Sequence, residues 1–187
     1  MNRRTFVTRA AAVGLVSACG GGTVSSGATP TIGLATSRPT ATPSTNTASR
    51  ATVELAKGGS FTFTLRPDKA PQTVARFVGK ARSGFYNDLT FNQAEDYFVV
   101  GGNPTGFAFT AANQVPSEYN DLPFVTGTVA IQRGSDPSRM SDSEFFVLKV
   151  DVRDWDTMYA NFGLVTAGMD VVRGINVGDK MKAIRIE

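Results

Sequence analysis

The chain has 187 residues, 41% of them hydrophobic, which suits one globular domain with extensions. Its formal charge of +3 comes from the first eighteen residues, where Arg3, Arg4 and Arg9 occur without any Asp or Glu, and the rest is neutral, with 16 basic against 16 acidic residues. This balance, without a basic run interleaved with aromatic residues, argues against nucleic acid as a partner. The chain has no histidine, which excludes His-dependent catalytic triads and His metal sites.

The N-terminus has the layout of an export signal. Arg3 and Arg4 precede a short apolar run, residues 10–18, that is about half of the ~20 residues a membrane-spanning helix needs. The pair Arg3-Arg4 before Thr-Phe resembles a twin-arginine signal, which exports folded proteins. With Cys19 lipidated the chain has no thiol left for a disulfide, and this fits twin-arginine export, but it fits the general secretory route nearly as well. Residues 16–19, Val-Ser-Ala-Cys, resemble a bacterial lipobox. We predict a signal peptide over residues 1–18 and lipid attachment at Cys19; a buried N-terminal helix is the alternative, and the glycines that follow disfavour it.

Residues 19–50 follow as a Gly, Ser, Thr, Ala and Pro segment without acidic residues. Such a composition cannot bury enough apolar surface to offset its chain entropy, which predicts a flexible linker. We therefore expect an extracytoplasmic domain, residues 51–187, tethered to a bacterial membrane through Cys19 on its periplasmic or cell-surface side. A spacer of no selected length explains the same composition equally well.

The domain begins with two segments that alternate apolar and polar residues, 52–55 and 61–65, and the glycine pair between them predicts a hairpin. A helix is expected from Pro71 to Gly84, because its apolar residues recur at helical spacing. Further strands are expected at 97–100, 127–132, 144–148, 159–165 and 181–186, with a short helix near 167–175. Short strands without a βαβ rhythm favour a closed antiparallel barrel.

Several segments resemble the signature blocks of the cyclophilins, the β-barrel peptidyl-prolyl isomerases, in the family's order and at about its spacing. They are Gly-Phe-Tyr at 84–86, Phe-Asn-Gln at 91–93, Phe-Val-Val-Gly-Gly at 98–102, Ser-Glu-Phe-Phe-Val at 143–147 and Asn-Phe-Gly at 161–163. The entry to the first helix, residues 65–77, and the segments 127–130 and 168–172 also match. The resemblance covers nearly all of residues 53–186, and it implies a mainly β fold, a closed eight-stranded antiparallel barrel capped by two helices.

The resemblance also implies a reaction. Rotation about an X-Pro amide is slow, with a barrier of ~20 kcal/mol, because resonance ties up the nitrogen lone pair. In cyclophilins an arginine donates a hydrogen bond toward the prolyl nitrogen while an apolar pocket holds the proline ring. No cofactor or metal takes part.

Carried over by position, the resemblance implies that substrate contacts come from pocket residues and one polar residue, Phe98, Val99, Ile131, Glu144, Phe146, Trp155 and Tyr159. Trp155 stands where a pocket leucine is expected and Tyr159 where many members have histidine. The usual glutamine between Val100 and Gly101 is absent, and Asn103 replaces an aspartate.

The catalytic position is Gln93, where the family has arginine. A neutral amide still donates, but a charge-assisted donor is about twice as strong, and the fork geometry of arginine is lost. Arg133 or Arg139, on the loop before Ser143, offers a replacement cation, although surface arginines commonly serve solubility.

Glu144 replaces a family glutamine with a carboxylate, which only accepts hydrogen bonds when ionised. The carboxylate has three interpretations. It selects peptides with a cation beside proline, it pairs with Arg133 or Arg139, or it is a neutral substitution at a position that catalysis no longer constrains.

Two functions, and a scaffold reading, follow from these residues. The first is a prolyl isomerase acting on X-Pro bonds of exported or envelope proteins, with weakened or altered catalysis. The second is a non-catalytic module that binds proline-containing peptides, and the third makes the barrel only a scaffold for contacts elsewhere. We expect a monomer whose partners are client proteins and, through Cys19, the membrane.

Overall fold

The computed structural model describes residues 48–106 and 113–187. The predicted signal peptide, Cys19 and most of the predicted linker therefore lie outside the described residues. Within the described residues the folded part includes Ala48, which is buried, and the Ser49 backbone N–H donates to the Glu187 carbonyl at 2.8 Å. The domain therefore includes residues slightly before the expected start at 51.

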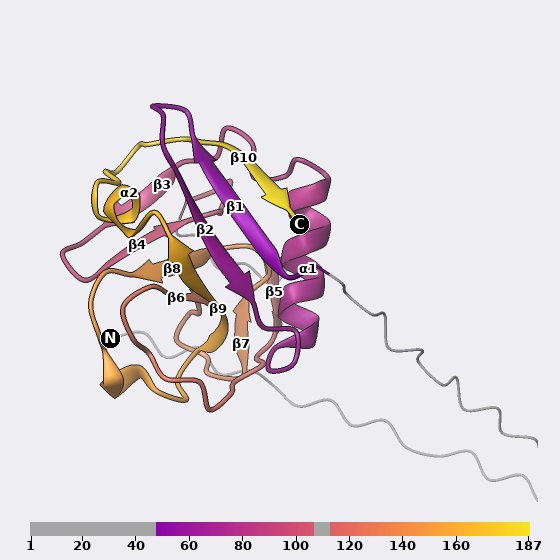
Figure 1. The fold of residues 1–187 in the computed structure, drawn as a ribbon. Coiled ribbons are helices and arrows are strands. Elements are labelled where there is room, and N and C mark those ends of the chain that lie inside the picture. The colour runs from indigo at the N-terminus through magenta and orange to yellow at the C-terminus, as the bar shows by residue number, and fades with distance from the viewer. Residues whose placement is uncertain (1–47, 107–112) are drawn as a thin grey trace, which may run out of the picture. The chain divides into compact units, whose positions relative to one another are not determined.

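Eight strands form one antiparallel sheet in the order β10-β1-β2-β9-β6-β8-β4-β3 (Figure 1). In chain order their bounds are β1 Arg50–Leu55, β2 Ser60–Leu65, β3 Phe91–Ala94, β4 Phe98–Gly101, β6 Thr128–Ile131, β8 Phe145–Leu148, β9 Ala160–Ala167 and β10 Met181–Ile186. A separate two-stranded sheet pairs β5 (Gln114–Pro116) with β7 (Arg139–Ser141). The helices are α1 (Pro71–Arg82), α2 (Met169–Arg173) and the 3-10 turn η2 (Arg153–Trp155).

The predicted closed barrel is not confirmed. The sheet is curled, and its outer strands β10 and β3 do not pair as a ladder in the described residues. What links these two edges is an isolated bridge between Thr90 and Lys180, with backbone hydrogen bonds such as Phe91 N–H to the Asp179 carbonyl at 2.8 Å. The mainly β character and the two helices are as expected.

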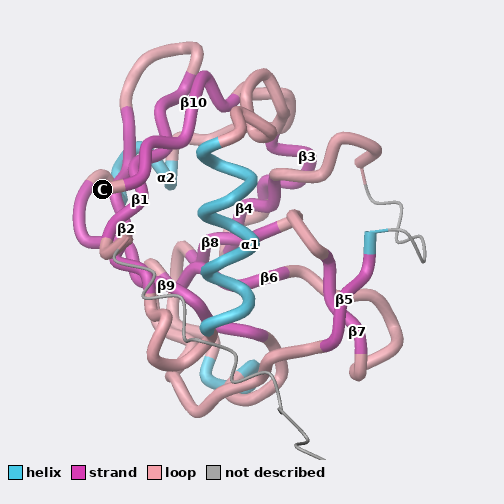
Figure 2. The backbone as a smooth tube through the Cα atoms, turned by 90° about the vertical axis from the view of Figure 1, so that its right-hand side faces the viewer, coloured by secondary structure: helices cyan, strands magenta, loops and turns pink. Residues whose placement is uncertain are grey.

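Helix α1 lies across the open side of the curled sheet (Figure 2). Pro71 begins it, and Val74, Phe77, Val78 and Ala81 form its buried face. Gly84, with φ +74°, follows its C-terminus in the left-handed conformation that glycine adopts readily. The predicted helix over 71–84 is thus confirmed.

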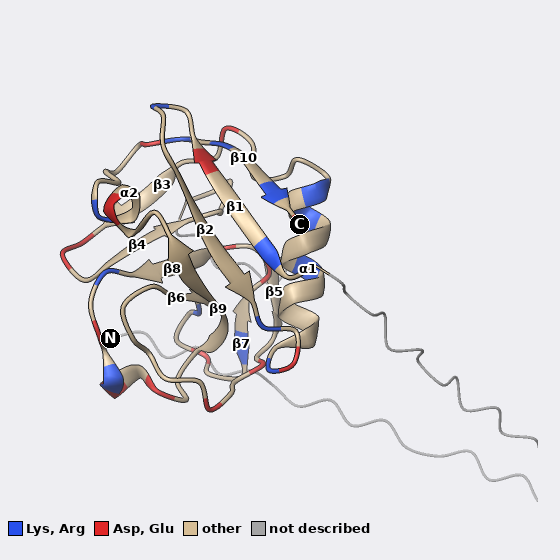
Figure 3. Cartoon of the chain, viewed as in Figure 1, with Lys and Arg blue, Asp and Glu red and all other residues tan. Residues whose placement is uncertain are grey.

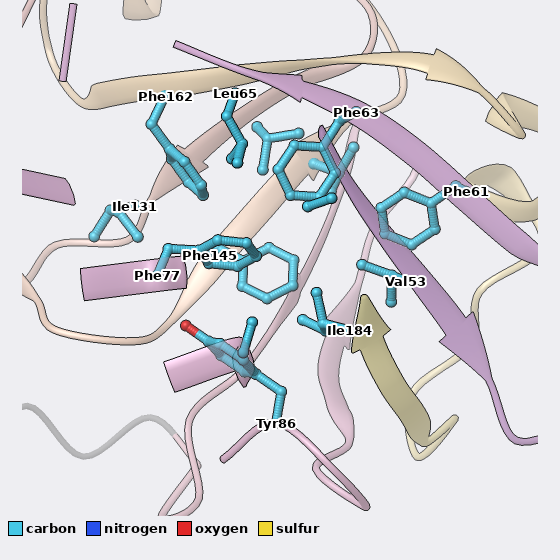
Figure 4. Packing of buried hydrophobic residues seen from close by; sticks show 14 of the residues in the cluster. Val53, Phe61, Phe63, Leu65, Phe77, Tyr86, Ile131, Phe145, Phe162 and Ile184 are labelled. Carbon is cyan, nitrogen blue, oxygen red and sulfur yellow. The ribbon is translucent and has the colours of Figure 1, made fainter. Parts of the chain in front are cut away.

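Phe77 on α1 belongs to the main core, which is the larger of the two clusters of buried hydrophobic residues (Figure 4). Its ring centroid lies 5.6 Å from that of Phe63 on β2, 5.8 Å from Phe145 on β8 and 5.2 Å from Phe162 on β9. These distances lie in the range favoured by aromatic pairs, so one helical side chain joins three strands.

Sequence patterning missed the strands β3, β5 and β7. Each has only three or four residues, Phe-Asn-Gln-Ala, Gln-Val-Pro and Arg-Met-Ser, which is too short for an alternation of apolar and polar residues to stand out. Their pairing is set by neighbouring strands, which local pattern cannot show.

No helix in the described part of the chain is long and apolar enough to cross a membrane. Acidic and basic residues are spread over the loops and strands in Figure 3, whereas the charged residues of α1 are all basic, Arg76, Lys80 and Arg82.

Candidate functional site

Three neighbouring strands, β4, β6 and β8, divide their side chains between two separate cores. Because successive residues of a strand point to opposite faces, Val99, Val129 and Val147 enter the main core, while Phe98 and Phe146 point to the other face. On that face lies a second cluster, here called the outer aromatic cluster: Phe98, Val100, Phe124, Ala130, Phe146 and Leu148, with the partly buried Val152, Trp155 and Tyr159.

Trp155 contacts three of the other aromatic residues of this cluster. Its centroid lies 5.9 Å from that of Phe98, 5.7 Å from Phe146 and 5.2 Å from Tyr159, and the exposed Tyr97 lies 5.9 Å away. Phe98 is only 6% exposed and Phe146 only 1%. Trp155 and Tyr159 are only partly buried, so they form the solvent-accessible part of the cluster, and the two phenylalanines lie beneath the surface.

The turn η2 holds Trp155 in place through Asp156. One carboxylate oxygen, Oδ1, accepts a hydrogen bond from the Phe124 backbone N–H at 2.7 Å, and Oδ2 accepts one from Arg153 Nε at 2.9 Å. These two donors, the Phe124 N–H first, hold the pKa of the Asp156 carboxyl below its usual value. Asp156 thus attaches η2 to the loop that contains Phe124.

Val99 and Ile131, two of the predicted substrate-contact residues, lie apart from the outer aromatic cluster. Both belong to the main core, with exposures of 0% and 3%, and they lie on the opposite face of the sheet from Phe98 and Phe146. The physical reason is the two-residue period of a strand, which separates Val99 from Phe98 and Ile131 from Ala130. Neither residue lines the outer aromatic cluster.

Gln93 lies on β3, next to a β-bulge. Phe91 pairs with Gly101 and Gln93 with Val100, so Asn92 is an extra residue on β3. This bulge matches the residue that the segment 98–102 lacks relative to the cyclophilin pattern. The Gln93 amide is half-buried and its Nε2 donates to Glu95 Oε1 at 3.4 Å, a long hydrogen bond.

Glu144 is fully buried beside Asn92. Asn92 Nδ2 donates to Glu144 Oε1 at 3.0 Å, and no ion pair to Glu144 occurs in the described residues. Burial raises the pKa of the Glu144 carboxyl, while hydrogen bonding from the side chains of Asn92 and Asn103 acts in the opposite direction. A carboxyl in this setting is neither exposed nor paired with a cation.

The two candidate arginines are held in different places. Arg133 lies over the Tyr159 ring, with 5.0 Å between the guanidinium carbon and the ring centroid. Arg139, on β7, donates through Nη2 to the Gln114 carbonyl at 2.9 Å, which directs it to β5. Only Arg133 contacts a member of the outer aromatic cluster.

A comparison with protein families identifies the chain. The model described as cyclophilin type peptidyl-prolyl cis-trans isomerase/CLD matches residues 50–187. The chain belongs to the cyclophilin family. This match covers the whole sheet, both helices and every described residue of the candidate site.

Relatives of this cyclophilin carry isomerase names. It is 30% identical over 135 residues to "Peptidyl-prolyl cis-trans isomerase B" of Bacillus subtilis, which is 71% of this chain and 94% of that protein. It is 31% identical over 138 residues to a "Probable peptidyl-prolyl cis-trans isomerase" of Brucella suis, 66% of this chain and 70% of that protein.

Solved structures share the fold. A Cryptosporidium parvum cyclophilin type isomerase aligns with a TM-score of 0.64 at 18% identity, over 75% of this chain and 98% of that chain. The cyclophilin AquaCyp293 from Hirschia baltica aligns with a TM-score of 0.59 at 16% identity, over 74% of each chain.

Sequence reasoning missed two parts of this cyclophilin's site, namely Phe124 in the outer aromatic cluster and Asn92 beside Glu144. Phe124 lies 6.3 Å from Phe146 and 6.1 Å from Tyr159 between ring centroids. It belongs to a loop without a periodic pattern, so no local signal marks it. Asn92 stands where the cyclophilin pattern Phe-His-Arg has histidine. This difference from the family pattern is the one feature of the sequence that could have drawn attention to Asn92.

Proposed function

We propose that this cyclophilin is a peptidyl-prolyl cis-trans isomerase whose catalysis is weakened by Gln93. The outer aromatic cluster carries the proposal, because it gathers Phe98, Phe146, Trp155 and Tyr159 on the outer face of the sheet. An apolar aromatic surface of this kind suits the ring of a proline residue.

The reaction needs only selective stabilisation of the twisted amide, in which the nitrogen has regained its lone pair. A donor aimed at that nitrogen accelerates rotation, and an apolar contact that holds the ring positions the bond. Gln93 Nε2 is the donor at the family's arginine position. Because it is neutral, we expect a rate lower than an arginine would give by on the order of 10² to 10³.

The second candidate is a non-catalytic module that binds proline segments. One observation favours it, since the Gln93 amide already donates to Glu95. In that case the outer aromatic cluster binds a proline peptide without accelerating its isomerisation.

Cis/trans exchange of an X-Pro peptide, followed by NMR, separates these functions. We would use the full chain carrying Cys19→Ser, with and without Gln93→Arg. Exchange above the uncatalysed rate in the chain that keeps Gln93 supports the isomerase, whereas activity only after Gln93→Arg supports the binding module. Silence in both chains, with no peptide binding, would reject both functions.

We also propose that the clients are exported or envelope proteins. The support is the sequence of residues 1–19, with its charged region, its short apolar run and the lipobox-like end at Cys19. Cells expressing the natural chain and Cys19→Ser, fed a labelled fatty acid, provide the test. Label incorporated only into the natural chain supports a lipid anchor, and equal labelling of both would contradict it.

A further inference from the structure

Arg133 is fixed at the edge of the outer aromatic cluster. Besides the contact with the Tyr159 ring, its Nε donates to the Met158 carbonyl at 3.0 Å and its Nη1 to the Gly134 carbonyl at 3.3 Å. A guanidinium has five N–H donors, so these bonds anchor the group and leave others for a ligand. The side chain is half-buried, so part of it meets solvent.

Arg133 has no acidic partner among the described residues. The nearest acid along the chain, Asp136, instead accepts hydrogen bonds from the backbone N–H and the hydroxyl of Ser138, at 2.9 and 2.7 Å. Asp156, at the other side of Tyr159 in the sequence, is bound to Arg153 and to the Phe124 N–H. A positive charge beside an aromatic surface is therefore left without a counter-ion.

Glu144 adds no negative charge to the surface of the outer aromatic cluster. Its carboxyl is fully buried and lies against Asn92 and Asn103, so it presents no charge to a ligand at the surface. The sequence had left open a preference for peptides with a cation beside proline, and the burial of Glu144 argues against that preference. Of the two candidate charges Glu144 and Arg133, only Arg133 is accessible at the cluster.

We propose that Arg133 is a specificity residue, which makes the outer aromatic cluster select proline segments with an Asp or Glu side chain next to the proline. The inference rests on the proposed proline binding and adds the substrate class. The proline ring lies against the aromatic side chains, and the neighbouring carboxylate accepts hydrogen bonds from the guanidinium. Arginine suits this role because its planar fork binds carboxylates with two parallel bonds.

The test is a titration of the full chain carrying Cys19→Ser, followed through Trp155, which is the chain's one tryptophan. The probes are blocked peptides of equal length with Glu, Gln or Lys immediately before or immediately after proline. We expect a Glu peptide to bind about threefold to fivefold more tightly than its Gln counterpart, and the Lys peptide more weakly, as for a partly exposed ion pair. Raising the salt concentration should reduce this preference.

Arg133→Gln is the decisive variant, and Arg139→Gln is its matched control, because Arg139 points to Gln114. We expect Arg133→Gln to bind the Glu and Gln peptides equally, while the control keeps the preference. Equal binding of Glu and Gln peptides by the chain with Arg133, or a preference that survives Arg133→Gln, would overturn the specificity role alone. If no peptide binds, including the Gln peptides, the proposed proline binding fails as well.

Discussion

Asn92 Nδ2 donates a 3.0 Å hydrogen bond to Glu144 Oε1, and the other oxygens of the same two side chains, Asn92 Oδ1 and Glu144 Oε2, are both buried without a hydrogen-bond partner among the described residues. Two acceptors left in this way are costly, because each has lost its hydrogen bonds to water. A proton on Glu144 Oε2 turns one of these acceptors into a donor, since an amide and a carboxylic acid can pair through two hydrogen bonds. Buried Glu144 is thus suited to the neutral form, in which it resembles the glutamine of the family pattern.

The raised pKa of Glu144 predicts a stability that falls with rising pH. The folded chain holds this proton more tightly than the unfolded chain, so the free energy of unfolding decreases from the ordinary carboxyl pKa of 4.5 up to the raised folded value. Glu144→Gln should remove this decrease and add about 1 kcal/mol to the stability at neutral pH. Urea unfolding at several pH values measures it. A Glu144→Gln chain that is less stable than the natural chain at neutral pH would contradict the prediction.

Trp155→Leu should uncover the phenylalanines below it. Trp155 contacts both Phe98 and Phe146, and leucine is the residue that the family pattern has at this position. We expect the affinity for a proline peptide to rise about fivefold to tenfold, from the additional apolar surface that the ring can bury.

Chemical shifts in an NMR titration measure that affinity, since the variant has no tryptophan for fluorescence. Val177→Ala is a suitable control, because Val177 is 65% exposed and belongs to neither hydrophobic cluster. A loss of affinity in Trp155→Leu would mean that the indole itself is the binding surface.

Glu118 caps α1 from a distant segment. The helix has no side-chain cap of its own, and the Glu118 carboxylate accepts from the backbone N–H of Gln72 at 3.1 Å and of Thr73 at 2.8 Å. A negative group at a helix N-terminus satisfies free N–H donors and complements the helix dipole. Glu118→Ala should therefore lower the free energy of unfolding by about 1 kcal/mol.

Thermal or urea unfolding measures this loss, with Asp154→Ala as the control, since Asp154 is an exposed acid of η2. Equal stability of the two variants would show that the carboxylate does not act as a cap.

Gly102 is required by both its backbone angle and its surroundings. Its φ is +91°, and a Cβ there would lie 2.8 Å from the Ser143 carbonyl oxygen and 3.0 Å from Cε1 of Tyr86. Because these neighbours are buried, Gly102→Ala should cost about 1–3 kcal/mol of stability.

Gly58→Ala separates the two causes. Gly58 has a similar φ of +96°, but a Cβ there meets nothing within 4 Å, so only the backbone cost remains. Denaturant unfolding of both variants gives the comparison. If they lose the same stability, crowding at Gly102 is not a cause.

The sequence by itself determined the hairpin over 52–65, the buried face of α1 and the family, because these depend on short-range periodicity and on residues in a fixed order. It also marked Phe98, Phe146, Trp155 and Tyr159, which the structure brings into one cluster. Only the tertiary structure decided which face of the sheet each side chain occupies, as Val99 and Ile131 show. The same holds for Asn92 against Glu144 and for Arg133 over Tyr159, because strand register and loop packing join residues that are distant in the chain.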